Sequence, residues 1–301
     1  MIAKTDTKDR LPDGLIERDL RGLRIFRVAA EARGFGAAES RLGMSRATIS
    51  RRIKEVESKL GTPLCTRGPQ GFELTEAGRA VLGLTAEALD ALDRIKPQVD
   101  ALRGLVSGDL AVGITDHAFS NPACRVPDAL RQLNEVAPGV RLEAHTLTIN
   151  ELTKALLERR IHVAIQGVHV RAASLQYVEL FQETHCIYTL DASAAGRVRP
   201  PLVNRIGQPF VQHALGELGF ERGPDAVGLD SVALFVCSGR FSGILPRHYV
   251  DQLAARAKLE IIPGSPQYTV TFCAVTDRTR PLPPSGARFI ELLRALHPKV
   301  S

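Results

Sequence analysis

Basic and hydroxyl side chains recur within residues 46–54 at a spacing that suits contact with nucleic acid. Arg46, Ser50 and Lys54 are four residues apart and Arg51 lies beside them, so in an α-helix they share one face. Such cations pair with phosphates, and arginine also fits the paired acceptors of guanine in the major groove. The pattern predicts a helix that contacts DNA, and its alternative is an ordinary solvated charged face.

Two short helical patterns would position these side chains. The first has an apolar face over residues 37–42 and ends at a Gly-Met-Ser turn, whose Ser45 stands where an N-cap belongs. The second has an apolar stripe at steps of four, three and four residues, made by Ile49, Ile53, Val56 and Leu60. A helical face from Asp19 to Arg33 would support both, which predicts a helix-turn-helix.

Charge is concentrated in the same region. Between Arg33 and Gly71 there are eight basic and three acidic residues, so most of the net charge of +6 lies there. The composition, 44% hydrophobic and 24% charged, is typical of a globular protein. The length of 301 residues predicts two or three domains. No apolar run is long enough to cross a bilayer and no signal peptide is evident, so we expect a cytoplasmic protein.

The segments that follow predict a wing and a dimerisation helix. Residues 67–71, Arg-Gly-Pro-Gln-Gly, join two short strand-like segments, and Arg67 there is either a phosphate contact or solvated. Thr75 is predicted to cap a helix to about Leu105, with a bend near residues 93–97 because Pro97 interrupts its hydrogen bonds. Its apolar residues have the coiled-coil period, which predicts pairing with a second copy: Ala88, Leu92, Ile95, Val99, Leu102 and Val106.

Beyond Ser107-Gly108 the chain alternates strands and helices. The βαβαβ order of residues 110–168 predicts a parallel, doubly wound sheet. Its expected strands are 110–115, 140–147 and 161–168, with helices at 121–136 and 150–158. Further strands are expected at 177–181, 186–190, 202–206, 243–245 and 268–275, and helices at 210–218, 231–237 and 285–296.

Residues 19–82 closely resemble the N-terminal domain of LysR-type transcriptional regulators. The segments that carry the resemblance are DLRGLRIF at 19–26, GFGAA at 34–38, Leu42, Ser45, Ser50, LGTPL at 60–64, Arg67 and LTEAG at 74–78. The rest resembles the family more loosely, through its element order, PGVRL at 138–142 and GRFSGILP at 239–246. Cys65 stands where the family commonly has Phe, and is interpreted as a smaller core residue.

The resemblance implies an α/β protein with an N-terminal winged helix-turn-helix, a long linker helix and a two-lobed, doubly wound effector module like that of periplasmic binding proteins. Residues 1–16 would be a disordered tail, 17–74 the DNA-binding domain, 75–106 the linker and 107–301 the effector module. Lobe 1 would comprise about 110–167 and 267–301, and lobe 2 about 168–266. The implied partners are double-stranded promoter DNA, an unknown small-molecule effector, one or three further copies of the chain, and RNA polymerase.

Two sets of candidate contacts follow. For DNA they are Ser45, Arg46, Ala47, Ser50, Arg51, Lys54 and Arg67. Arg46 and Ala47 replace the family's usual Gln and Pro, so Arg46 is expected either to read guanine or to hold a phosphate. For the effector, candidates lie at strand ends between the lobes, together with Phe241 in the GRFSGILP segment: Thr115, Asp116, His117, Thr148, Gln166, Asn204, Arg205 and Phe241.

Other functions have weaker support. The common catalytic and nucleotide-binding motifs are absent and the eight histidines are dispersed, so we expect no enzyme, cofactor or metal site. A small-molecule-binding protein or enzyme whose basic N-terminus only mediates oligomerisation is the alternative. A thiol-switched regulator is another, although the five cysteines form no C-x-x-C pair.

Overall fold

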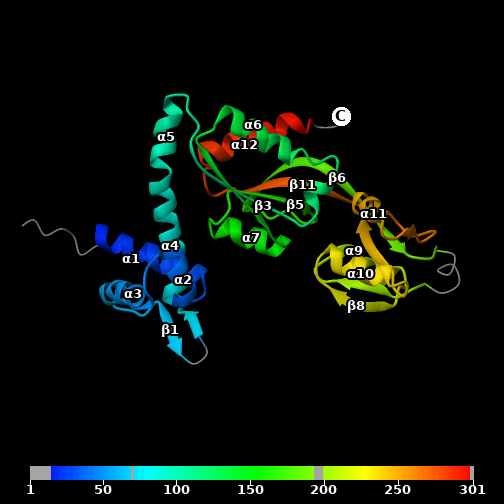
Figure 1. Cartoon of the computed structure of the whole chain (residues 1–301), viewed down its shortest axis with the longest axis horizontal. Helices are drawn as coiled ribbons and strands as arrows, with labels where there is room; N and C mark the ends of the chain where they lie inside the picture. The colour runs from blue at the N-terminus through cyan, green and yellow to red at the C-terminus, as the bar shows by residue number, and fades with distance from the viewer. Residues whose placement is uncertain (1–14, 69–70, 193–198, 299–301) are drawn as a thin grey trace, which may run out of the picture. The chain divides into compact units, whose positions relative to one another are not determined.

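The computed structural model describes residues 15–68, 71–192 and 199–298 (Figure 1). The chain divides into two compact units, residues 1–93 and 94–301. The predicted disordered tail therefore lies outside the described residues except for Leu15 and Ile16. No helix in the described ranges has both the length and the apolar character needed to cross a bilayer.

Three helices and a hairpin form the first unit. The helices are α1 (Glu17–Glu31), α2 (Phe35–Leu42) and α3 (Arg46–Leu60), and the hairpin pairs β1 (Cys65–Gly68) with β2 (Gly71–Leu74) antiparallel. The predicted stripe residues Ile49, Ile53 and Val56 are buried against α1. The predicted helix-turn-helix and wing are confirmed, and Cys65 is a buried core residue as expected.

The predicted long helix is two helices. The Thr75 hydroxyl accepts a hydrogen bond from the Gly78 N–H (2.9 Å) and so caps α4 (Glu76–Asp93), as predicted. A break at Arg94 separates α4 from α5 (Ile95–Leu102), within the segment where a bend was expected. Pro97 becomes the third residue of α5, where a backbone N–H would have no partner within the helix, so the proline is tolerated.

The first lobe of the second unit is a mixed sheet between two helical layers. β3 (Gly108–Ile114) pairs in parallel with β4 (Val140–Thr146) and β5 (Val163–Val168), as the βαβαβ order predicts. β11 (Tyr268–Asp277) pairs antiparallel with β5. Helices α6 (Val126–Val136) and α12 (Pro284–Leu296) cover one face, and α7 (Ile149–Leu157) covers the other (Figure 1).

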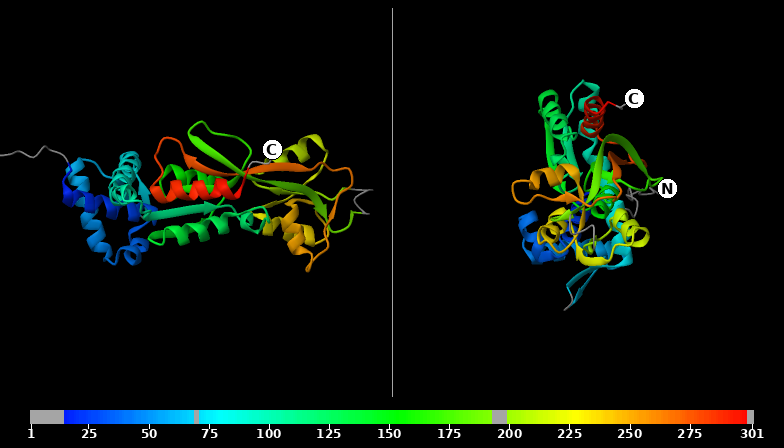
Figure 2. Two further views of the ribbon diagram at one scale, coloured as in Figure 1. Left: turned by 90° about the horizontal axis from the view of Figure 1, so that it is seen from above. Right: turned by 90° about the vertical axis from the view of Figure 1, so that its right-hand side faces the viewer.

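Two long strands join the lobes. β6 (Leu175–Thr189) pairs with β11 over most of its length, and the two run side by side (Figure 2). Leu180 and Phe181 of β6 belong to the core of the first lobe, whereas Cys186 belongs to that of the second. The chain therefore passes from the first lobe to the second within β6, and it returns near Tyr268 of β11.

The second lobe packs helices against short strands. Its remaining elements are β7 (Leu202–Arg205), α9 (Pro209–Glu217), β8 (Arg222–Ala226), α10 (Leu229–Cys237), β9 (Gly243–Pro246), α11 (Arg247–Leu253) and β10 (Glu260–Ile261). β8, α11 and β10 were not predicted, and the two strands expected at 177–181 and 186–190 are the single strand β6. The helix expected from Asn121 begins at Val126, after a short 3-10 turn, η1 (Ala118–Ser120).

Candidate functional site

The second helix of the helix-turn-helix is held by its caps and its buried face. The Ser45 hydroxyl accepts a hydrogen bond from the Thr48 N–H (3.3 Å), so Ser45 is the N-cap that the sequence predicts. Gly43 closes α2 in the left-handed conformation (φ +60°), a backbone geometry that glycine adopts without strain. The buried stripe fixes the rotation of α3, so its opposite face is directed outwards.

The outward face of α3 carries the cations that the sequence singled out. Arg46, Arg51 and Lys54 are exposed, and none of the three forms an ion pair with another described residue. Ala47 is also exposed and Ser50 is half-buried. Arg52, which lies beside them, is instead paired with Glu55 (3.0 Å). Arg67 lies in β1 opposite Phe72.

A cleft of about 560 Å³ lies between the two lobes of the second unit. Six of the predicted effector contacts line it: Thr115, Asp116, His117, Thr148, Gln166 and Arg205. The first three follow β3, Gln166 lies near the end of β5, and Arg205 ends β7. The rule that ligands bind beyond the carboxyl ends of parallel strands therefore located the cleft and part of its lining.

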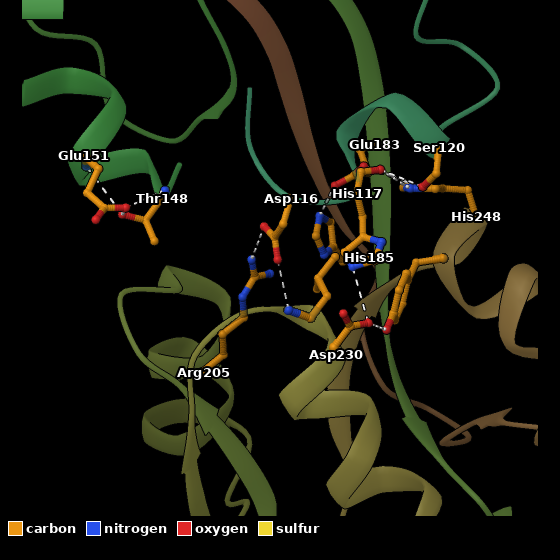
Figure 3. A network of polar contacts seen from close by, with 12 residues as sticks. Asp116, His117, Ser120, Thr148, Glu151, Glu183, His185, Arg205, Asp230 and His248 are labelled. Atoms are coloured by element: carbon orange, nitrogen blue, oxygen red, sulfur yellow. Dashed lines mark hydrogen bonds and ion pairs between the residues drawn. The ribbon is translucent and has the colours of Figure 1, made fainter. Parts of the chain in front are cut away.

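Asp116 connects the two walls of the cleft (Figure 3). Its carboxylate accepts a hydrogen bond from the Leu229 N–H at the start of α10 (3.2 Å) and lies 3.8 Å from the Arg205 guanidinium. The Arg205 side chain is largely buried, and this desolvation lowers its pKa. Among the described residues, Asp116 is thus the only carboxylate that pairs with Arg205, and at 3.8 Å this ion pair is long.

A buried carboxylate beside two imidazoles also lines the cleft (Figure 3). Glu183 is 5% exposed, and its oxygens lie 2.9 Å from His185 Nε2 and 3.5 Å from His248 Nδ1. Burial lowers the pKa of His248 and of the nearby His169. Within the described part of the chain no set of three or more His, Cys, Asp or Glu side chains is arranged to hold a metal ion.

Both halves of the chain match models of one protein family. Residues 20–79 match the bacterial regulatory helix-turn-helix protein model of the lysR family, and residues 103–298 match the LysR substrate binding domain. The chain belongs to the LysR family of transcriptional regulators. It is a regulator with a helix-turn-helix DNA-binding domain and an effector-binding domain, and regulators of this family bind DNA and small-molecule effectors and form oligomers.

Individual relatives agree with this assignment. The HTH-type transcriptional activator BauR of Pseudomonas aeruginosa is 30% identical over 278 residues, which cover 87% of this chain and 90% of BauR. The regulator IlvR of Caulobacter vibrioides is 32% identical over 147 residues, 49% of each chain. Among solved structures, a full-length OxyR variant from P. aeruginosa has a TM-score of 0.63 at 20% identity (91% and 94% coverage), and CbnR has 0.60 at 24% (93% and 99%).

Two predicted effector contacts of this LysR-type regulator lie elsewhere. Asn204 is buried and donates a hydrogen bond to Asp225 (2.6 Å), because it precedes Arg205 on β7 and adjacent side chains of a strand point to opposite faces. Phe241 packs edge-on against Phe235 of α10, with ring centroids 5.7 Å apart, and does not line the cleft. The structure therefore does not bring these two residues to the cleft with the other six.

Some lining residues were not predicted. They include His169, Glu183, His185 and Gln208. Glu183 and His185 are buried polar residues at positions i and i+2, which place both side chains on one face of β6. This spacing is visible in the sequence, but it falls in the segment interpreted as a break between two strands. Thr148 lines the cleft as the N-cap of α7, with its hydroxyl and its N–H both bonded to Glu151.

Proposed function

We propose that the outer face of α3 reads base sequence in the major groove, and that Arg46 binds a guanine. The observation that carries this proposal is a set of exposed cations, Arg46, Arg51 and Lys54, which form no ion pair with any described residue and lie on a helix whose inner face is buried in the core. Arg46 is the first residue of α3, and the N-terminal residues of a recognition helix are those that contact base edges. Ser45, Ala47, Ser50, Arg51 and Lys54 would complete the contacts in the groove, and Arg67 would hold a phosphate beside it.

The test of Arg46 uses paired operators that differ at single guanines. Arg46→Ala should lose discrimination of about 1–3 kcal/mol at one guanine and leave the preference at other positions unchanged. Arg52→Ala is the matched control, because Arg52 is on the same helix but already paired with Glu55. An Arg46→Ala protein that binds every operator more weakly by the same factor would show that Arg46 only contacts a phosphate.

We infer that the helices of residues 75–106 join two copies of the chain. The predicted seam residues Leu92, Ile95, Val99 and Leu102 are 43%, 57%, 49% and 89% exposed. A helix that leaves such a stripe in water gains free energy by burying it against a partner. We further propose a cytoplasmic protein that pairs into dimers or tetramers on DNA and can contact RNA polymerase there.

We propose that the cleft is a binding site for a regulatory ligand and has no catalytic role. Thr115, Asp116, His117, Thr148, Gln166 and Arg205 would contact the ligand. A ligand that binds one arrangement of the lobes better than another shifts the protein towards that arrangement. Such a shift would change how far apart the recognition helices of the oligomer lie, and hence which operators it occupies.

A thiol switch has less support than ligand binding. Cys124, Cys186 and Cys273 are buried, and burial raises the pKa of each thiol, that of Cys273 to about 11. A thiol with a raised pKa is a poor nucleophile towards peroxide. Peroxide should therefore leave operator affinity unchanged, both in wild type and after substitution of Cys237, the most accessible of the four cysteines in this unit.

A further inference from the structure

The acidic side chains that line the cleft form close polar contacts with described residues. The guanidinium of Arg205, which also lines it, forms only a long ion pair. Glu151 is bonded to the cap residue Thr148 (2.8 and 2.9 Å), and Glu183 lies beside His185. The nearest carboxylate to Arg205 is that of Asp116, at 3.8 Å, which is too long for a hydrogen bond. The described residues therefore leave the donors of Arg205 available to a ligand.

The position of Asp116 resembles that of a bound anion. Its carboxylate comes from the first lobe, but both groups that it contacts belong to the second: Arg205 and the first N–H of α10. A cation and a helix N-terminus that face one point form a favourable site for a carboxylate. The second lobe thus provides an anion site, and a side chain of the first lobe fills it.

We propose that Asp116 is a resident occupant of a carboxylate site, and that the effector is a small carboxylic acid whose carboxylate replaces Asp116 beside Arg205. This inference rests on the proposed function of the cleft as an effector site. It specifies which group of the ligand is recognised and which group of the protein the ligand must displace.

The rest of the cleft limits the remainder of such a ligand. Val170, Ile206 and Val227 line the cleft and are 86%, 62% and 63% exposed, so an apolar ligand body would cover them. Gln166 and Gln208 are at least nine-tenths buried, and the side-chain oxygen of each has no hydrogen-bond partner among the described residues. The cleft therefore suits an aliphatic or aromatic acid that carries a hydrogen-bond donor.

Displacement of Asp116 would be transmitted to the contact between the lobes. The residues that follow it hold the second lobe, since His117 Nε2 lies 3.3 Å from Asp230 and the Gln252 side chain donates to the Ser120 carbonyl (3.1 Å). A ligand that takes the place of Asp116 removes the contacts of Asp116 with Leu229 and Arg205 and adds its own. Ligand binding and lobe arrangement are coupled through this segment.

The experiment measures binding of three probes with the same six-carbon chain, hexanoate, hexanamide and hexylamine, to the full-length protein by calorimetry. Wild type should bind hexanoate at least about tenfold more tightly than the other two probes, because only the carboxylate pairs with Arg205. Asp116→Asn should bind hexanoate at least about tenfold more tightly than wild type, since a competing charge is removed. Arg205→Gln should lose the preference for hexanoate.

The matched control is Asp251→Asn, an exposed site on α11 that makes the same change of charge outside the cleft. Its affinity for hexanoate should stay within about twofold of wild type. The inference is overturned if neither wild type nor Asp116→Asn binds hexanoate saturably. It is also overturned if hexylamine binds best and Asp116→Asn abolishes that binding, because Asp116 would then hold a cationic ligand.

Duplex binding by the same samples separates this inference from the proposed function. Asp251→Asn should keep the operator preference of wild type, because Asp251 lies outside the cleft and in the unit that does not contain α3. Loss of the preference for carboxylates with duplex binding intact would refute only the class of ligand. Loss of operator preference in wild type would refute the regulatory function.

Discussion

The substitution Gly78→Ala tests whether close packing of α4 on Leu64 stabilises the DNA-binding domain. Gly78 is buried in the first turn of α4, and a Cβ added there would lie 1.8 Å from the Leu64 carbonyl oxygen. Gly83, one and a half turns further along the same helix, has no neighbouring atom within 4 Å of such a Cβ. The same substitution, glycine to alanine, should therefore have opposite effects at the two sites.

The magnitudes follow from helix propensity and packing. Alanine in place of glycine within a helix contributes about 1 kcal/mol. Gly83→Ala should show this gain. Gly78→Ala must instead move α4 away from the backbone of Leu64, and overpacking of this kind costs about 1–3 kcal/mol or more. We expect Gly78→Ala to lose at least about 2 kcal/mol of unfolding free energy relative to Gly83→Ala.

Urea unfolding followed by circular dichroism at 222 nm measures both effects, and operator affinity provides a functional readout. Leu64 lies between the end of α3 and the wing, so Gly78→Ala should also weaken duplex binding while Gly83→Ala should not. Gly78→Ala as stable as Gly83→Ala would refute the close packing of α4 on Leu64.

Two further predictions concern the effector module and the helix α5. Burial lowers the pKa of His169 and His248 below the ordinary value of 6.5, so the unfolded chain binds protons that the folded chain does not. Stability should be complete above about pH 7 and fall as the pH drops through 6.5, and a denaturation midpoint that is constant or rises from pH 7 to pH 5 would contradict this. Leu102→Glu should weaken self-association at least about tenfold in sedimentation, because a charge would replace an apolar contact. Gln98→Glu, an exposed site on the same helix, is its control, and an unchanged dimer in Leu102→Glu would exclude this residue from the interface.

Periodicity predicted the DNA-binding domain well, because each of its elements has one face in the core. The steps of four, three and four from Ile49 to Leu60 describe a helix with one buried side, and three of these four residues are fully buried. The turn and the cap were also local features of the sequence, visible as Gly43 and Ser45. Local patterns of this kind do not depend on where the rest of the chain lies.

The cleft was only partly predictable from the sequence, because the way the chain passes between the two lobes decides which residues face it. The polar residues from Gln182 to His185 interrupt an apolar segment and so predict the end of a strand. In the structure they lie within β6 where it passes from one core to the other, and Glu183 and His185 face the cleft. The strand-end rule found Arg205 but could not exclude Asn204, because it says where a strand ends and not which way each side chain points.

The most direct test of the account is the preference of the wild-type protein for one duplex over another. Operators selected from genomic fragments should bind at least about 10³-fold more tightly than scrambled duplexes of the same length at physiological salt. Both affinities should fall as salt rises, because the contacts that we propose for the cations of α3 include phosphates as well as bases. Equal affinity for selected and scrambled duplexes would contradict the claim that α3 reads DNA sequence.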